Sequence, residues 1–198
     1  MRAEFMPKEQ NHTYEKLYYT LWELAGRYSG FCQFRAVGNS HDDRLIPMLE
    51  VGNGAQMIFC VAGIDGTQNL LPRLLIQMAE EYCRAYECGW QLEEFYEVKK
   101  LLDKIRICFL PLLNPDGYEI NQSGFSMIRN PIYRQMLRMQ SIPAKDFGYN
   151  ARGVDICHNF PTVHYIRSRM GEEPASENET KALIRIMQEY GGRGLLTF

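Results

Sequence analysis

Three short polar segments of this sequence carry side chains that could do chemistry: residues 63–68, 114–118 and 155–160. In the first segment, Asp65 and Gln68 offer oxygen atoms three positions apart. The Asp65 carboxylate could bind a metal, whereas the neutral amide of Gln68 is a poor zinc ligand. The same pair fits a variant of the capping box at a strand-to-helix turn, and we favour that structural role over metal binding.

Cys157 and His158 are the residues of the third segment that could act as nucleophile and base. Adjacent residues on an extended chain point apart, and nothing in the sequence indicates a lowered pKa for the Cys157 thiol. We therefore expect no Cys–His nucleophile. His158 could bind a carboxylate when protonated or be an ordinary loop residue, and both interpretations stay open. We expect the other histidines to be solvated surface residues: His12, His41 and His164.

The elements that must position these segments alternate between strand and helix. Apolar residues at helical spacing predict helices at residues 14–28, 72–86, 93–102 and 176–190. Continuous or short apolar runs predict strands at residues 31–37, 45–51, 57–62, 105–113 and 194–198. This alternation predicts an α/β fold, a three-layer sandwich in which helices flank a mixed, largely parallel sheet. Sites in such sheets form at the C-terminal ends of strands, where all three polar segments lie.

Local signals divide the chain further. Gly26, Ser29 and Gly30 should end the first helix, and Pro47 should lie near a sheet edge or a bulge. Asn114-Pro115-Asp116-Gly117 predicts a turn. Residues 118–175 show no clear period and are expected to form a long site-forming loop region. Ser176 and Glu179 have the spacing of a capping box at the start of the last helix.

Composition limits the class of protein. With 198 residues, we expect one domain over 1–198 with a substantial core. The net charge of −2 argues against a nucleic-acid-binding face, and no stretch is apolar enough for a membrane span. The N-terminus has no apolar signal region, so we expect a cytoplasmic protein. Six cysteines without a C-x-x-C pair are expected to be buried free thiols.

Four landmarks, taken in order, resemble those of the zinc metallocarboxypeptidases, the carboxypeptidase A/B-like family. Residues 114–118 read N-P-D-G-Y after a buried strand, a hallmark of that family. Residues 63–68 resemble its G-I-H-x-R-E segment, and residues 153–161 resemble its G-V-D-x-N-R-N segment. Residues 173–182 resemble its acidic E-P-E-T-K-A helix start. The resemblance covers most of the chain and implies the family's fold, without its C-terminal third.

The resemblance also implies a zinc site, from which this chain departs. Family members hold zinc with the His and Glu of H-x-x-E and a later His, leaving one position for water. Asp65 and Gln68 occupy the first two ligand positions. The chain stops at Phe198, where the family would next present its third ligand. We therefore expect no zinc, or weak binding, and an incomplete sheet whose exposed edge a protein partner or a second copy would cover.

The substrate-binding positions have changed as well. The family's Asn and Arg, which clamp the terminal carboxylate of a peptide, are matched by Cys157 and His158, while Asn159 is retained. An imidazole cannot reproduce the fork geometry of a guanidinium.

One arginine of the family polarises the scissile carbonyl. Arg129 is the match for it, with Arg134 and Arg138 as nearby alternatives.

The leading hypothesis is a metallocarboxypeptidase-like domain with degenerate zinc and carboxylate-binding positions. Such a domain would be a non-catalytic homologue that binds a peptide or carboxylate ligand or serves as a scaffold. The alternative is an active zinc carboxypeptidase, or its N-terminal portion, that cleaves C-terminal residues from peptides. A third hypothesis is a regulatory subunit without a ligand.

Overall fold

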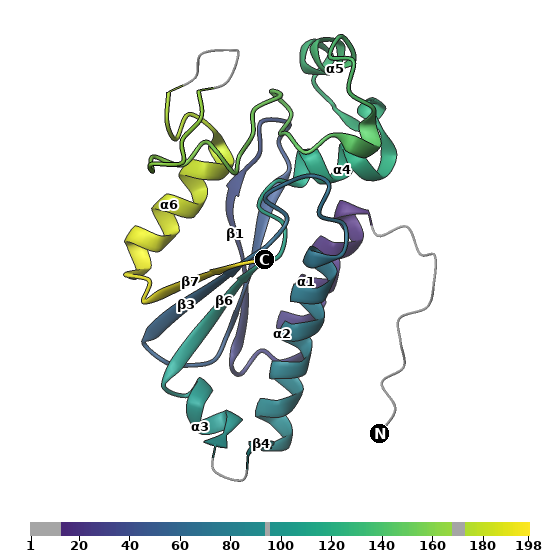
Figure 1. Cartoon of the computed structure of the whole chain (residues 1–198). Coiled ribbons are helices and arrows are strands. Elements are labelled where there is room, and N and C mark those ends of the chain that lie inside the picture. The colour runs from purple at the N-terminus through teal and green to yellow at the C-terminus, as the bar shows by residue number, and fades with distance from the viewer. Residues whose placement is uncertain (1–12, 94–95, 168–172) are drawn as a thin grey trace.

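A five-stranded sheet forms the centre of the computed structural model, which describes residues 13–93, 96–167 and 173–198 (Figure 1). In spatial order its strands are β1 (Cys32–Asn39), β2 (Leu45–Val51), β6 (Ile105–Leu110), β3 (Gln56–Val61) and β7 (Gly194–Thr197). The β1–β2 and β2–β6 pairs are antiparallel, and the β6–β3 and β3–β7 pairs are parallel. The predicted mixed α/β sheet is confirmed.

Helices cover both faces of this sheet and make it the middle of three layers (Figure 1). On one face, α1 (Tyr14–Arg27) and α2 (Leu71–Cys88) pack their apolar stripes on strand residues such as Leu49 and Phe109. On the other face, α6 (Asn178–Tyr190) packs on a second cluster that includes Phe59 and Leu110. Alternate residues of β3 and β6 thus enter two separate cores, which explains their continuous apolar sequences.

The ends of the first helix and the place of Pro47 have clear local causes. Thr13 accepts a hydrogen bond from the Lys16 backbone N–H at the start of α1. The helix continues through Gly26 and ends at Arg27, one residue before the predicted end at position 28, so Gly26 does not stop it. Pro47 lies opposite Ala36, beside a register shift in β1, and β6 pairs with β2 only from Leu49. The bulge expected there is confirmed.

The segment after α2 differs from its prediction. The helix expected at 93–102 is restricted to α3 (Val98–Leu102), preceded by the short strands β4 (Gln91–Leu92) and β5 (Tyr96–Glu97), which pair as a hairpin. Residues 94–95 lie outside the described part of the chain.

Both ends of the last helix–strand unit differ as well. Helix α6 begins at Asn178 with Glu177 at its N-cap position, and no side chain caps it, so the predicted capping box is wrong. Ser176 donates its hydroxyl to Glu177 instead. The expected buried strand at the chain end is β7, whose Leu195 and Leu196 are exposed.

Residues 118–175 hold more regular structure than the expected loop region. The N-P-D-G segment begins helix α4 (Pro115–Ser123) rather than a turn, because Asn114 caps it and Pro115 occupies the first turn. The 3-10 turn η1 (Phe125–Met127), helix α5 (Pro131–Arg138) and a second 3-10 turn, η2 (Ala144–Asp146), follow. A third apolar cluster holds them together: Ile120, Ile128, Leu137, Phe147 and Ala151.

The six cysteines are free thiols, as expected, but Cys88 and Cys157 are exposed rather than buried. Within the described residues, no helix combines the length and the apolar character needed to cross a membrane.

Candidate functional site

The ends of the parallel strands β3 and β6 meet through the Asn114 side chain. The Asn114 backbone N–H donates to the Gly63 carbonyl at 2.8 Å. Its side-chain amide donates to the carbonyls of Ile64 and Gly148 at 3.2 and 3.3 Å, and its oxygen accepts the Gly117 N–H at 2.9 Å. Asn114 is fully buried, so one side chain joins the first two predicted segments to the loop that leads to the third.

Glycine allows the backbones of these segments to touch. A Cβ atom on Gly66 would lie 2.6 Å from the Gly117 carbonyl carbon, closer than any side chain permits. The Gly66 N–H donates to the Gly148 carbonyl at 2.9 Å, which adds the loop that leads to the third segment. The first two segments therefore meet at one edge of the sheet as expected, whereas the third segment follows the 3-10 turn η2 rather than a strand.

Asp65 and Gln68 are hydrogen-bonded inside their own turn. Asp65 Oδ1 accepts the backbone N–H and the hydroxyl of Thr67, both at 2.7 Å. The Gln68 amide oxygen accepts the Ile64 N–H at 3.2 Å, and its nitrogen donates to the Phe198 carbonyl at 3.3 Å. The structural role predicted for the pair thus takes the form of an Asx turn, not a helix cap, because α2 begins at Leu71 without a side-chain cap.

This donor set does not fit the zinc ion that the resemblance implies. Asp65 supplies a carboxylate oxygen that already accepts two hydrogen bonds. Gln68 supplies a neutral amide oxygen that is engaged with the backbone. Zinc in proteins favours thiolate, imidazole and carboxylate ligands.

The third segment is organised by Asp155. Its Oδ1 accepts the Cys157 N–H at 2.9 Å, and its Oδ2 lies 2.8 Å from His158 Nδ1. Partial desolvation of the sulfur, followed by the charges of Asp155 and Asp65, raises the pKa of the Cys157 thiol to about 11, although the residue as a whole is exposed. A thiol with this pKa stays protonated at neutral pH, which argues against a nucleophilic role. Because the Asp65 charge affects this thiol, the first and third segments must lie near each other.

Asn159, the third substrate-binding candidate, is buried and holds the start of α6. Its side-chain amide donates to the Ser176 hydroxyl at 3.0 Å, and its oxygen accepts the Glu177 N–H at 3.2 Å. Its predicted contact with substrate stays a prediction.

A cavity of about 820 Å³ opens beside Asp155 and His158. Tyr149, Ile142 and Arg167 are among its other lining residues, so the cavity combines apolar walls with an imidazole, a carboxylate and a guanidinium. This mixture is typical of a ligand pocket with a few orienting polar groups.

Arg129 is not among the residues that line this cavity. Its backbone N–H donates to Asp42 Oδ2 at 2.8 Å, and its guanidinium donates to the Asp43 carbonyl at 3.3 Å. The alternatives Arg134 and Arg138 both lie on α5. The predicted role in polarising a carbonyl stays a prediction for Arg129.

A buried charged network holds the loop that carries Arg129, and no pattern in the sequence indicated it. Arg44 Nη1 lies 2.7 Å from Asp42 Oδ2 and 3.0 Å from Asp116 Oδ1. The Ser40 hydroxyl donates to Asp116 at 2.7 Å. These four residues are at most 2% exposed, although Ser40 and Asp42 lie among turn-forming residues between β1 and β2.

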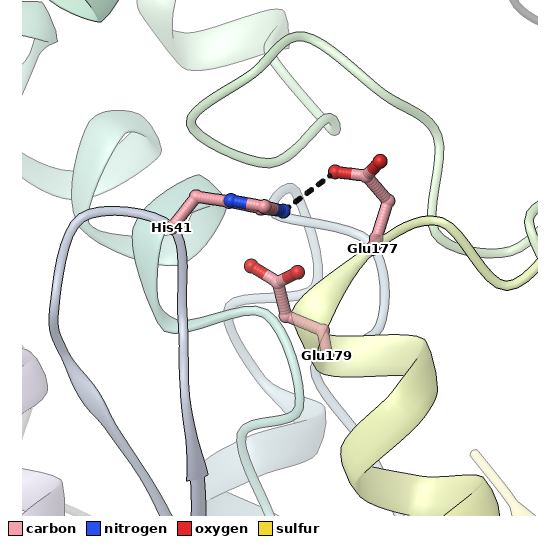
Figure 2. A group of neighbouring side chains, drawn as sticks. All are labelled: His41, Glu177 and Glu179. Atoms are coloured by element: carbon pink, nitrogen blue, oxygen red, sulfur yellow. Dashed lines mark ion pairs between the residues drawn. The ribbon is translucent and has the colours of Figure 1, made fainter. Parts of the chain in front are cut away.

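A second cluster that the sequence did not reveal consists of His41, Glu177 and Glu179 (Figure 2). His41 Nε2 lies 3.0 Å from Glu177 Oε2, so its prediction as a solvated surface residue is wrong. His164 is exposed, as predicted, and His12 lies outside the described residues.

The two glutamates of this cluster have opposite pKa shifts. Burial raises the pKa of Glu177, but hydrogen bonds from His41, Asn150 and Ser176 outweigh it and lower the pKa to about 2. Burial and then the charge of Asp116 raise the pKa of Glu179 to about 7.

Comparisons with known proteins identify the family of the chain. A family model described as zinc carboxypeptidase matches residues 17–198. The carboxypeptidase N catalytic chain of Homo sapiens is 25% identical over 208 residues, which cover 91% of this chain and 40% of that protein. The inactive metallocarboxypeptidase ecm14 of Schizosaccharomyces pombe is 34% identical over 109 residues, which cover 51% of this chain and 20% of that protein.

Solved structures give the same fold. Bovine thrombin-activatable fibrinolysis inhibitor, in complex with tick carboxypeptidase inhibitor, matches with a TM-score of 0.71 at 16% identity, covering 95% of this chain and 60% of that one. Carboxypeptidase A from Helicoverpa armigera matches with a TM-score of 0.61 at 19% identity, covering 96% of this chain and 48% of that one. The chain thus spans less than two thirds of the length of each of these relatives.

Proposed function

The chain belongs to the zinc carboxypeptidase family, and from this premise we propose that it is a non-catalytic member that binds the carboxylate end of a peptide. The observation that carries the proposal is the donor set at the family's metal positions. Asp65 and Gln68 are committed to hydrogen bonds within their turn, and one of the two is a neutral amide. Without a Lewis acid at that place, the domain would keep the cleft but not the hydrolysis.

The cavity beside the third segment supports a carboxylate ligand. Arg167 lines it and could bind a carboxylate through two parallel hydrogen bonds. The ring of His158 is oriented by Asp155 on the opposite nitrogen, which leaves Nε2 for the ligand. Arg167 also lies 3.9 Å from the exposed Glu173 carboxylate.

Titration calorimetry with a peptide and its C-terminally amidated form tests the binding. We expect the free carboxylate to bind at least about tenfold more tightly, since hydrogen bonds between charged groups contribute about 1.5–3 kcal/mol. His158→Ala and Arg167→Ala should each reduce that difference. Arg84→Ala, which removes an exposed ion pair on α2, is the matched control and should leave it unchanged. Equal affinity for both peptides would contradict the proposal and favour a subunit without a ligand.

The non-catalytic part of the proposal is tested separately. The same peptides are incubated with the protein and added zinc, and the release of C-terminal residues is followed by mass spectrometry. We expect no release above that of protein-free controls. Turnover that disappears in the Asp65→Asn variant would overturn this part of the proposal and establish an active zinc carboxypeptidase.

For the compartment, we keep the cytoplasm as a proposal. The six free thiols support it, because disulfide bonds form and persist outside the cell, whereas thiols stay reduced in the cytoplasm. Protein isolated without reductant should titrate with six thiols after denaturation, whereas a lower number would indicate disulfides and a different compartment.

A further inference from the structure

The cluster of His41, Glu177 and Glu179 joins two distant parts of the chain. His41 lies in the loop between β1 and β2, and the two glutamates lie at the start of α6 (Figure 2). One ligand atom from each residue lies within 4.8 Å of the other two. Metal–ligand bonds of about 2.0–2.2 Å put ligand atoms roughly 3–4 Å apart, so small rotations of the side chains would close the site.

Hydrogen bonds within the protein leave part of this cluster unsatisfied. Glu179 is fully buried, and its Oε1 has no hydrogen-bond partner among the described residues. Its carboxylate is turned toward the space between the His41 ring and Glu177 (Figure 2). A buried carboxylate oxygen without a partner costs about 1–3 kcal/mol or more, so a group that binds it is expected.

The position of His41 Nε2 bears on the same unsatisfied oxygen. This nitrogen lies 3.0 Å from Glu177 Oε2 and 3.4 Å from the Asn178 backbone nitrogen, so it donates to Glu177 when protonated and accepts from Asn178 when not. A proton on Nε2 would satisfy the contact with Glu177 but would leave Glu179 Oε1 unbonded. A divalent cation would bind the imidazole nitrogen and both carboxylates together.

We propose that His41, Glu177 and Glu179 bind a first-row divalent metal ion such as Zn²⁺, at a place separate from Asp65 and Gln68. An imidazole with two carboxylates suits zinc or manganese better than calcium or magnesium, which favour all-oxygen sites. The bound ion clamps the β1–β2 loop to the first turn of α6 and thereby stabilises the fold.

Neighbouring groups would orient the ligands. Arg152 Nη1 and the Ser176 hydroxyl bond Glu177 Oε1 at 2.9 and 2.7 Å. Asn150 donates to Glu177 Oε2 at 2.7 Å and to Glu179 Oε2 at 3.4 Å. Such outer hydrogen bonds fix metal ligands in place. The His41 side chain is 15% exposed, so an ion can enter past its ring.

The experiment titrates chelator-treated protein with Zn²⁺ alone and measures bound metal, affinity and melting temperature. We expect one equivalent at this site and a higher melting temperature, because a ligand of the folded state stabilises it. His41→Gln and Glu179→Gln, which preserve size, should each weaken the binding at least about tenfold. Asp65→Asn and His164→Ala are the controls and should leave it unchanged. Mg²⁺ should not substitute.

A measurement on the unaltered chain covers the case in which the variants do not fold. The sequence has four histidines, so their ring resonances can be told apart by NMR. Zinc should shift the ring signals of His41 selectively. Absence of binding, binding without a shift of His41, or binding lost in Asp65→Asn but kept in His41→Gln would overturn the proposal. None of these results depends on whether the domain binds peptides.

Discussion

Arg44 balances two carboxylates in the interior of the protein. Asp42 and Asp116 have side-chain exposures of 1% and 0%, and the Arg44 guanidinium is 2% exposed. Arg44 also donates to the Met127 carbonyl at 2.7 Å, which joins the β1–β2 loop to the segment that carries Arg129. A single cation thus supports the position of a candidate site residue that it does not touch.

Replacing this cation should destabilise the protein strongly. In Arg44→Met, Asp42 and Asp116 lose their counter-ion while still buried, and we expect the free energy of unfolding to fall by about 3–5 kcal/mol. Urea denaturation followed by circular dichroism measures the change. Arg27→Met removes an exposed ion pair with Glu80 at 3.5 Å and should cost less than about 1 kcal/mol. Equal losses in the two variants would show that the network contributes no more than a surface pair.

At this scale the sequence revealed the candidate residues but not their partners. Asp65 and Gln68 could be found because they stand in a segment after a buried strand, and Cys157 because its segment resembles a family motif. Asp42 and His41 could not, because turn-forming residues look solvated and only the fold shows that α4 and α6 cover them. For the second cluster, the sequence offered one indication, the two glutamates Glu177 and Glu179 near the start of α6.

The turn after β3 and helix α4 form one unit, held by contact between glycine backbones. Gly66 packs directly against Gly117, and a Cβ on Gly117 would in turn lie 2.4 Å from the Tyr149 carbonyl. Any side chain at these positions would separate the strand ends from the loop that precedes the third segment. The arrangement of the candidate site therefore depends on residues that offer no chemistry of their own.

A methyl group at Gly66 should disturb this contact. We expect Gly66→Ala to lower the free energy of unfolding by about 1–3 kcal/mol, because the backbone must shift to accept the extra carbon. Gly26 lies inside α1, and a Cβ atom added there would meet nothing within 4 Å, so Gly26→Ala should raise stability by roughly 0.5–1 kcal/mol. Thermal unfolding of both variants tests the pair. A neutral Gly66→Ala variant would contradict the close packing.

Periodicity predicted the long helices and the buried strands because their apolar stripes face a continuous core. Prediction failed where the same short sequence is compatible with two local structures. Asn114 followed by Pro115 can form a turn or begin a helix, and the tertiary bonds of Asn114 select the helix. Glu177 occupies the cap position of α6 because the Asn159 side chain accepts its N–H, a contact 18 residues away in sequence.

Three apolar clusters divide the part of the molecule that the structure describes. Two lie on opposite faces of the sheet and share its strands. The third, beneath α4 and α5, contains five buried residues and no strand. Because this cluster is separate from the main cores, the helices of residues 118–150 have no apolar stripe that faces those cores. Their positions could therefore not be predicted from hydrophobic periodicity. Such a unit should open more easily than the sheet.

Hydrogen exchange can measure this difference in stability. Phe147 is fully buried in the third cluster, with its ring 5.3 Å from Phe125 and 5.4 Å from Tyr149. We expect Phe147→Ala to lower the free energy of unfolding of this unit by about 3 kcal/mol or more. Because about 1.4 kcal/mol corresponds to a factor of ten, amides of α4 and α5 should exchange at least about a hundredfold faster. Amides of β3 and β6 should keep their protection, since the sheet retains both its cores. Phe59→Ala, in the sheet, is the matched variant and should reduce protection throughout. Equal acceleration of β3 and α5 in Phe147→Ala would show instead that the three clusters unfold as one.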